Sequence, residues 1–279
     1  MQQLAAAKSV PEAHEAEPAN AGVPRESALV SIVERHVLPR LLLAQPSLAR
    51  PDRFGDGLSD RIPALVKYAM RSDDARLQEL LHALHRRGLT FSQIQIGLLA
   101  PAARRLNTFW ESDEATFVDV TIATGSLQRM MRFVALDLIP LGHPRQQNKT
   151  ILISAAPGDD HGFGAAMAAE FYRRAGWAVR HDLAPTREGL VHGVAAGWID
   201  VLGLSLTASR EAESLKETIR QVRPAALNPN LVIIASGDAL LRNPDIAADL
   251  GVDATLFELP SAPARTQRLV RETRHRDAG

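Results

Sequence analysis

The sequence contains no cysteine, which excludes disulfide bonds, thiolate metal ligands and thiol nucleophiles from its chemistry. The aromatic fraction is also small, at 5%. The 32 basic and 32 acidic side chains leave a formal net charge of zero, so the chain as a whole lacks the positive field that holds a nucleic-acid backbone. We therefore expect direct DNA binding to be absent or weak.

Long apolar runs are also missing. No uninterrupted run approaches the roughly 20 residues that a helix needs to cross a bilayer. The N-terminus lacks a basic segment followed by an apolar core, which is the pattern of a secretory signal. These absences, with the missing cysteines, predict a cytoplasmic protein without a membrane partner.

The first half of the 279-residue chain divides into a tail and a helical region. Residues 1–25 are rich in Ala, Glu and Pro and have no apolar period, so we expect a disordered tail. Residues 26–140 show apolar side chains at spacings of three and four, most clearly between Phe117 and Leu138. This pattern predicts a bundle of four or five helices.

Residues 141–149 interrupt all periodicity with Gly, Pro and a polar run, as an interdomain linker would. In residues 150–279 short β-branched runs alternate with amphipathic stretches, which predicts a Rossmann-like, doubly wound, five-stranded parallel sheet. The fold class is therefore α + α/β, with the bundle first. The expected strands are 150–154, 177–183, 199–205, 231–235 and 254–258, and the expected helices lie near 162–175, 187–197, 209–223, 239–250 and 261–275.

The loop after the first expected strand contains the most distinctive group of polar residues. Ligands of doubly wound sheets bind beyond the carboxyl ends of the strands, where this loop lies. Asp159 stands two residues before His161, which suits a histidine that binds a metal through one ring nitrogen and donates to a carboxylate from the other. Alternatively, His161 only caps the loop and Asp159 or Asp160 is the N-cap of the next helix. Gly162 and Gly164 would let a bulky ligand approach the backbone.

The pattern Asp159-x-His161-x-x-Gly164 resembles the signature of cobalamin-binding domains of the methionine synthase and methylmalonyl mutase type. This resemblance implies that His161 is the lower axial ligand of cobalt and that Asp159 orients its ring. The cofactor contacts that it implies in this loop are Asp159, Asp160, His161, Gly162, Phe163 and Gly164.

The resemblance extends to the ends of the third and fourth expected strands. Ser205 matches the serine of a Ser-x-Leu motif that lines the pocket for the nucleotide tail; here Leu206 follows directly and Thr207 takes the leucine's place. Gly237 matches the second glycine of a Gly-Gly pair against the tail, and Ser236 replaces the first. Small residues also end many parallel strands for packing reasons alone.

The segment around Phe109 and Trp110 resembles the helical cap that precedes such domains, in which an aromatic residue lies over the upper face of the corrin. The alternative is that both rings simply anchor the bundle core. Light-sensing regulators of this type carry a Glu-His pair where this chain has Val120 and Thr121. Hydroxo- or aquo-cobalamin is therefore expected rather than the adenosyl form.

Taken over its full length after about residue 26, the chain resembles the PpaA/AerR group of photosynthesis regulators of purple bacteria. That resemblance implies a photoreceptor or oxygen-responsive antirepressor, not an enzyme, which acts through a partner transcription repressor of the PpsR/CrtJ type. A corrinoid carrier subunit of a methyltransferase is the alternative. A phosphorylation receiver is set aside, because Ser205 and Glu258 stand at or near the strand ends where a receiver needs Asp and Lys.

Overall fold

The computed structural model describes residues 57–140, 148–159, 162–182 and 186–276. The expected tail, the first part of the expected bundle and most of the expected linker lie outside these ranges. No helix within them is long and apolar enough to cross a membrane.

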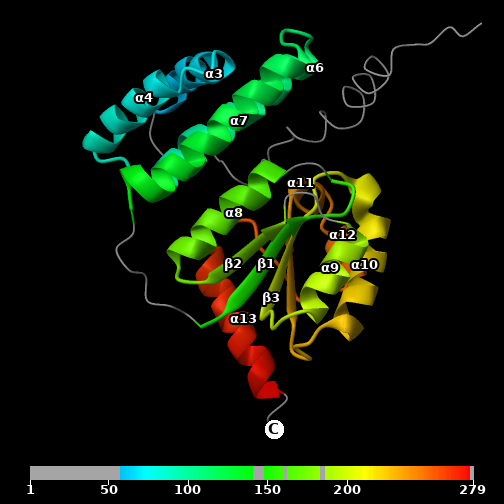
Figure 1. Cartoon of the computed structure of the whole chain (residues 1–279). Helices are drawn as coiled ribbons and strands as arrows, with labels where there is room; N and C mark the ends of the chain where they lie inside the picture. The colour runs from blue at the N-terminus through cyan, green and yellow to red at the C-terminus, as the bar shows by residue number, and fades with distance from the viewer. Residues whose placement is uncertain (1–56, 141–147, 160–161, 183–185, 277–279) are drawn as a thin grey trace, which may run out of the picture.

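The N-terminal part of the described chain is a helical bundle (Figure 1). Side-chain caps fix where its helices begin. Asp73 accepts a hydrogen bond from the backbone N–H of Arg76, and Thr116 and Asp119 form a capping box. The helices are α3 (Ile62–Met70), α4 (Asp74–Arg86), α5 (Phe91–Ile94), α6 (Ala100–Glu111) and α7 (Phe117–Phe133), with a short 3-10 turn η4 (Ser59–Arg61) and π-helical segments η5 (Gln95–Leu99) and η6 (Val134–Leu138).

The period of three and four in α7 is confirmed by its burial. Its inner face packs against α3, α4 and α6, whereas Val118 and Ile122 on the opposite face are exposed. The buried positions of the predicted period are Val120, Thr124, Leu127, Met131, Val134 and Leu138.

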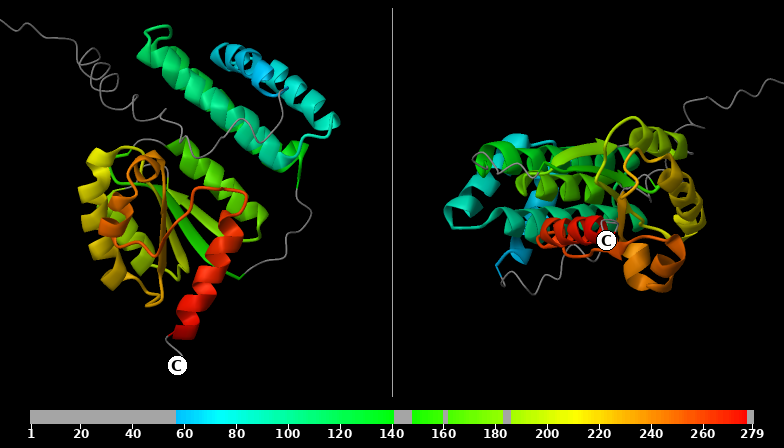
Figure 2. Two further views of the ribbon diagram at one scale, coloured as in Figure 1. Left: turned by 180° about the vertical axis from the view of Figure 1, so that it is seen from behind. Right: turned by 90° about the horizontal axis from the view of Figure 1, so that it is seen from below.

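The C-terminal part is a five-stranded sheet in the order β2-β1-β3-β4-β5, in which all pairs are parallel, as predicted. Helices α8 and α13 cover one face, and α9 and α10 cover the other (Figures 1 and 2). The strands are β1 (Thr150–Ala155), β2 (Ala178–Asp182), β3 (Val201–Ser205), β4 (Val232–Ser236) and β5 (Ala254–Thr255); the helices are α8 (Gly162–Arg174), α9 (Arg187–Ala195), α10 (Ala212–Ala225), α11 (Asp238–Arg242), α12 (Asp245–Leu250) and α13 (Ala262–Arg276), with a 3-10 turn η7 (Ser209–Glu211).

Three details of the predicted sheet domain are wrong. The single helix expected over 239–250 is two, because Pro244 cannot donate a hydrogen bond and Asn243 before it is extended, with φ −136° and ψ 88°. The strand expected over 254–258 has only two residues. Strand β2 is an edge strand and is only partly buried, in contrast to the buried strand that was expected.

The bundle and the sheet domain are joined through α8. Phe163, Met167 and Phe171 of this helix belong to the same buried cluster as the bundle's leucines. At the end of α8 the guanidinium of Arg174 lies 4.1 Å from the centre of the Phe91 ring, and it donates a hydrogen bond of 2.6 Å to the carbonyl of Ile139. One face of α8 is thus part of the bundle core.

Candidate functional site

The loop after β1 is tied to the neighbouring strand at the carboxyl edge of the sheet. The N–H of Ala156 donates to the carbonyl of Ser205 at 2.8 Å, and the N–H of Asp159 donates back to the carbonyl of Ala156 at 2.8 Å. Gly158 makes the turn with φ +85°, in the left-handed region that favours glycine. The loop is therefore a fixed turn at the position predicted for ligand binding.

Asp159 is the central polar residue of this turn. Its side chain is buried, and one carboxylate oxygen accepts a 2.8 Å hydrogen bond from the backbone N–H of Thr207. This bond joins loops that are 48 residues apart in the sequence. Asp160 and His161 lie outside the described residues, but Asp159 and Gly162 on either side of them are both at this edge of the sheet.

Thr207 contributes a second buried polar group. Its hydroxyl oxygen is buried and has no hydrogen-bond partner in the structure. An unsatisfied buried hydroxyl costs about 1–3 kcal/mol, so such a group is retained where a ligand or water can pair with it.

Gly237 closes the same edge at the end of β4. Its backbone has φ +127°, and a Cβ atom there would lie 2.0 Å from the carbonyl oxygen of Leu206. The N–H of Leu206 donates to the carbonyl of Ser236 at 2.8 Å, so the ends of β3 and β4 are packed backbone to backbone. Only glycine can occupy position 237.

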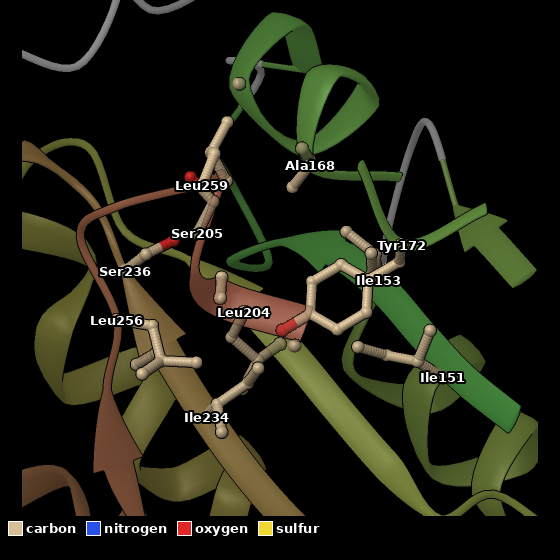
Figure 3. A pocket seen from close by; sticks show the side chains of 15 residues that line it. Ile151, Ile153, Ala168, Tyr172, Leu204, Ser205, Ile234, Ser236, Leu256 and Leu259 are labelled. Atoms are coloured by element: carbon tan, nitrogen blue, oxygen red, sulfur yellow. The ribbon is translucent and has the colours of Figure 1, made fainter. Parts of the chain in front are cut away.

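Below this edge a narrow pocket with a cavity volume of about 30 Å³ lies between the sheet and helices α8 and α13. Figure 3 shows the side chains of Ser205 and Ser236 close together at one end and those of Ile151 and Tyr172 toward the other. The lining is Ile151, Ile153, Gly164, Ala165, Ala168, Tyr172, Gly203, Leu204, Ser205, Ile234, Ala235, Ser236, Leu256, Leu259 and Ala262.

The alternation of side chains along a strand explains why Ser205 and Leu206 face opposite sides of the sheet. Ser205 and Ser236, which are paired in register, face α8 and α13 and line the pocket. Leu206 is fully buried in the core cluster that also contains residues of α9 and α10, and its side chain is not part of the pocket lining.

Several lining residues were not predicted from the sequence. Ala165, Ala168 and Tyr172 come from α8, and Gly203 and Ile234 from the strands. The Tyr172 hydroxyl is 2.6 Å from the Thr266 hydroxyl oxygen, and burial raises the pKa of Tyr172 to about 12. The small residues at 164, 165 and 168 are a sequence signal for close approach of α8, but their role became clear only with the helix placed on the sheet.

Three other predicted site residues are not part of the pocket lining. Gly162 begins α8, and a Cβ atom there would meet nothing within 4 Å. Phe163 is buried in the shared core of the bundle and α8. Trp110 lies in the last turn of α6, half-buried against the bundle core. The described residues contain no group of three or more His, Asp or Glu side chains that could hold a metal by themselves.

Comparison with solved structures identifies proteins of similar fold. The chain superposes on the monomethylamine corrinoid protein of Methanosarcina barkeri with a TM-score of 0.59, 16% identity, and coverage of 74% of this chain and 96% of that one. The two proteins share a fold. A cobalamin-binding protein from Desulfitobacterium hafniense DCB-2 covers 75% of this chain and 98% of its own at 18% identity, but its TM-score of 0.40 is too low to support an argument.

Sequence comparison adds one distant relative. An uncharacterized 20.5 kDa protein of Rhodobacter capsulatus, from the bchF-crtJ intergenic region, is 25% identical over 159 residues, which cover 57% of this chain and 82% of that protein. No family model matches the chain.

Proposed function

We propose that this chain is a cobalamin-binding regulator of transcription that acts through a partner repressor in response to light or oxygen. The observation that carries the proposal is the edge of the sheet: the buried carboxylate of Asp159, held by Thr207, directly above a pocket lined by Ser205 and Ser236. The fold shared with a corrinoid protein supports it.

The residues at this edge fit a corrinoid. The unpartnered hydroxyl of Thr207 can pair with a polar group of a ligand, and the open space at Gly162 leaves the backbone accessible. His161 would supply the lower axial ligand of cobalt. Asp159, whose carboxylate is held by the N–H of Thr207, would orient the ring of His161.

The pocket lies where the nucleotide tail of such a cofactor would enter, and because its cavity volume is about 30 Å³, helices α8 and α13 would have to move apart to admit the tail. The walls of the pocket are mostly aliphatic, and the hydroxyls of Ser205 and Ser236 lie at one end of it. The hydroxyls of Ser205 and Ser236 would pair with polar atoms of the tail. Gly164 belongs to the same lining, and Trp110 would shield the upper face from the bundle side.

Regulation follows from the shared core of α8 and the bundle. When bound, the cofactor supplies a cobalt centre whose upper ligand can be exchanged, with hydroxo- or aquo-cobalamin the form proposed here. Phe163 belongs to the bundle core and directly follows Gly162 at the edge of the sheet. A change of the ligand bound at this edge would therefore alter how the bundle packs on α8. The partner proposed is a PpsR/CrtJ-type repressor. The relative from the bchF-crtJ region supports a link to photosynthesis genes.

A corrinoid carrier subunit of a methyltransferase is the second candidate. The specific observation in its favour is that the neighbour with a TM-score of 0.59 is a monomethylamine corrinoid protein. The two functions share the site and differ in the partner. Methyl transfer from the loaded chain to any thiol or amine acceptor, in the presence of a methyltransferase, would favour the carrier.

The first test is cofactor retention. The full chain is incubated with hydroxocobalamin, desalted and measured by absorption spectroscopy, beside His161→Ala and the control His192→Ala, whose histidine is exposed on α9. We expect wild type and His192→Ala to retain cobalamin with the same spectrum, and His161→Ala to show a changed spectrum or weaker retention. No retention by wild type in light or darkness would refute the cofactor, and identical spectra for all three would refute the role of His161.

A further inference from the structure

The amino-end edge of the sheet, opposite the cofactor site, carries an exposed tryptophan. Trp198 precedes β3 and is 51% exposed, whereas Trp177 is buried. The indole N–H of Trp198 donates to a carboxylate oxygen of Asp200 at 3.3 Å, which orients the ring while about half of the residue stays exposed. An ordered, half-exposed indole is the type of residue that dominates binding energy at protein interfaces.

Basic side chains surround this indole. Arg274 of α13 donates to the same oxygen of Asp200 at 2.6 Å and is half-exposed. The guanidinium of Arg180 lies against Gly197, since its nitrogen is 3.1 Å from where a Cβ atom at that position would be. Lys149, just before β1, is buried beneath this surface with its ammonium 5.8 Å from the centre of the Trp177 ring, near Arg271 and Arg274.

Asp200, the acidic residue at the centre of this surface, is buried and already accepts several hydrogen bonds. The carboxylate of Asp200 is 3% exposed and accepts from the backbone N–H of Thr150 at 2.7 Å, besides Trp198 and Arg274. In the described part of the chain Arg180 and Arg271 form no ion pair. Burial and then the charges of Arg271 and Arg274 lower the pKa of Lys149.

The clustering of basic side chains around Asp200 favours the binding of an anionic partner. Like charges gathered around one carboxylate repel each other, and the repulsion falls when an anionic partner approaches. Arg265 and Arg268, on the exposed face of α13, extend the basic surface. The same face also carries the exposed acidic residue Glu272. In Figure 1 the end of α13 lies on the side of the sheet away from the bundle, so this surface is separate from the cofactor site.

We propose that Arg180, Trp198, Arg271 and Arg274, the Trp198 surface, bind an acidic segment of a partner protein. Carboxylates of that segment would pair with the arginines, and an apolar side chain would pack on the exposed indole. The fit is one of charge complementarity around an aromatic anchor, with arginine and tryptophan the residues most enriched at such contacts. A protein is favoured over nucleic acid because the net charge of the whole chain is zero. The proposal does not depend on cofactor binding.

The test uses a fluorescein-labelled dodecapeptide of alternating glutamate and leucine, titrated with the full chain at low salt and followed by anisotropy. The variants are Trp198→Ala and the double variant Arg180→Glu/Arg271→Glu, neither of which removes an ion pair. The controls are Leu241→Ala, which removes another exposed apolar side chain, and Arg220→Glu on α10, which reverses an exposed charge on the other face. Circular dichroism confirms that each variant folds.

We expect the peptide to bind wild type and both controls alike and to bind each test variant at least about tenfold more weakly, or about 1.4 kcal/mol. The lysine–leucine counterpart peptide should not bind. Absent binding by wild type, or equal binding by the test variants, overturns the proposal. A single-stranded oligonucleotide that binds more tightly than the peptide and depends on Trp198 also overturns it, in favour of nucleic acid.

Discussion

At Gly237 the fourth strand turns so close to its neighbour that a single added methyl group would overlap the carbonyl oxygen of Leu206. The positive φ adds strain for any other residue. We predict that Gly237→Ala lowers the free energy of unfolding by on the order of 3 kcal/mol in urea denaturation. Gly203→Ala is the control, because its Cβ would meet Ile153 at an ordinary 3.5 Å. Equal stability of the two variants would contradict this account.

The neighbouring Asp238 predicts a pH dependence. Its side chain is buried and ion-paired with Arg242, and burial raises its pKa although the charge of Arg242 and the hydrogen bond from it oppose the shift. A carboxyl with a raised pKa in the folded state favours the protonated form, so its contribution to stability is lost as pH rises through that pKa.

We therefore expect Asp238→Asn to gain stability relative to wild type as pH rises above about 4, the ordinary pKa of an aspartate. Urea midpoints at several pH values measure the difference. Asp249→Asn, at an exposed position of α12, should show no comparable trend. A difference between Asp238→Asn and wild type that stays constant with pH would refute the argument.

Single residues also show where sequence reasoning stops. The loop at Asp159 and the strand ends at Ser205 and Gly237 could be predicted, because their residue types and order behind β1 are distinctive. That Leu206 belongs to the opposite core could not be predicted from the motif, since the motif's spacing in this chain differs by one residue and one residue reverses the face of a strand.

Among the elements, α8 and α5 are held together by Arg174. Its guanidinium stacks on Phe91 and donates to the carbonyl of Ile139, so it joins three segments. We predict that Arg174→Met costs about 1–2 kcal/mol and speeds hydrogen exchange of the amides of α5. Arg173→Met, which removes only the pair with Glu170 one turn away, should leave that exchange unchanged. If hydrogen exchange of the α5 amides were unchanged in Arg174→Met, the claim that Arg174 holds α8 and α5 together would be refuted.

The order of elements in the sheet domain followed from alternating strand and helix patterns, and five parallel strands were found. The errors have local causes. Asn243 and Pro244 divide one expected helix, and β5 is short although its sequence continues to be apolar. Which face of α8 contacts the bundle depends on long-range packing, and its alanines and aromatics do not distinguish the two faces.

For the whole molecule, cofactor binding should appear as stability. A ligand that binds only the folded state at a hundred times its dissociation constant adds about 2.7 kcal/mol. Because the bundle and α8 share one core, we predict that the whole described chain unfolds in one thermal transition. Hydroxocobalamin should raise the midpoint temperature of that transition, and not of a separate transition of the sheet domain. Calorimetry measures this, with His161→Ala as the variant expected to lose most of the gain. Two transitions that respond separately would show that the parts unfold independently.

The shared core also constrains how such a protein can be recombined. A gene fusion that cuts between residues 140 and 150 would leave Phe163, Met167 and Phe171 with the sheet domain, where they would face a bundle not shaped for them. Exchange of bundles between relatives therefore requires that these three positions on α8 change with the incoming helices. Among relatives, substitutions at these three positions of α8 should therefore be correlated with substitutions in the core of the bundle.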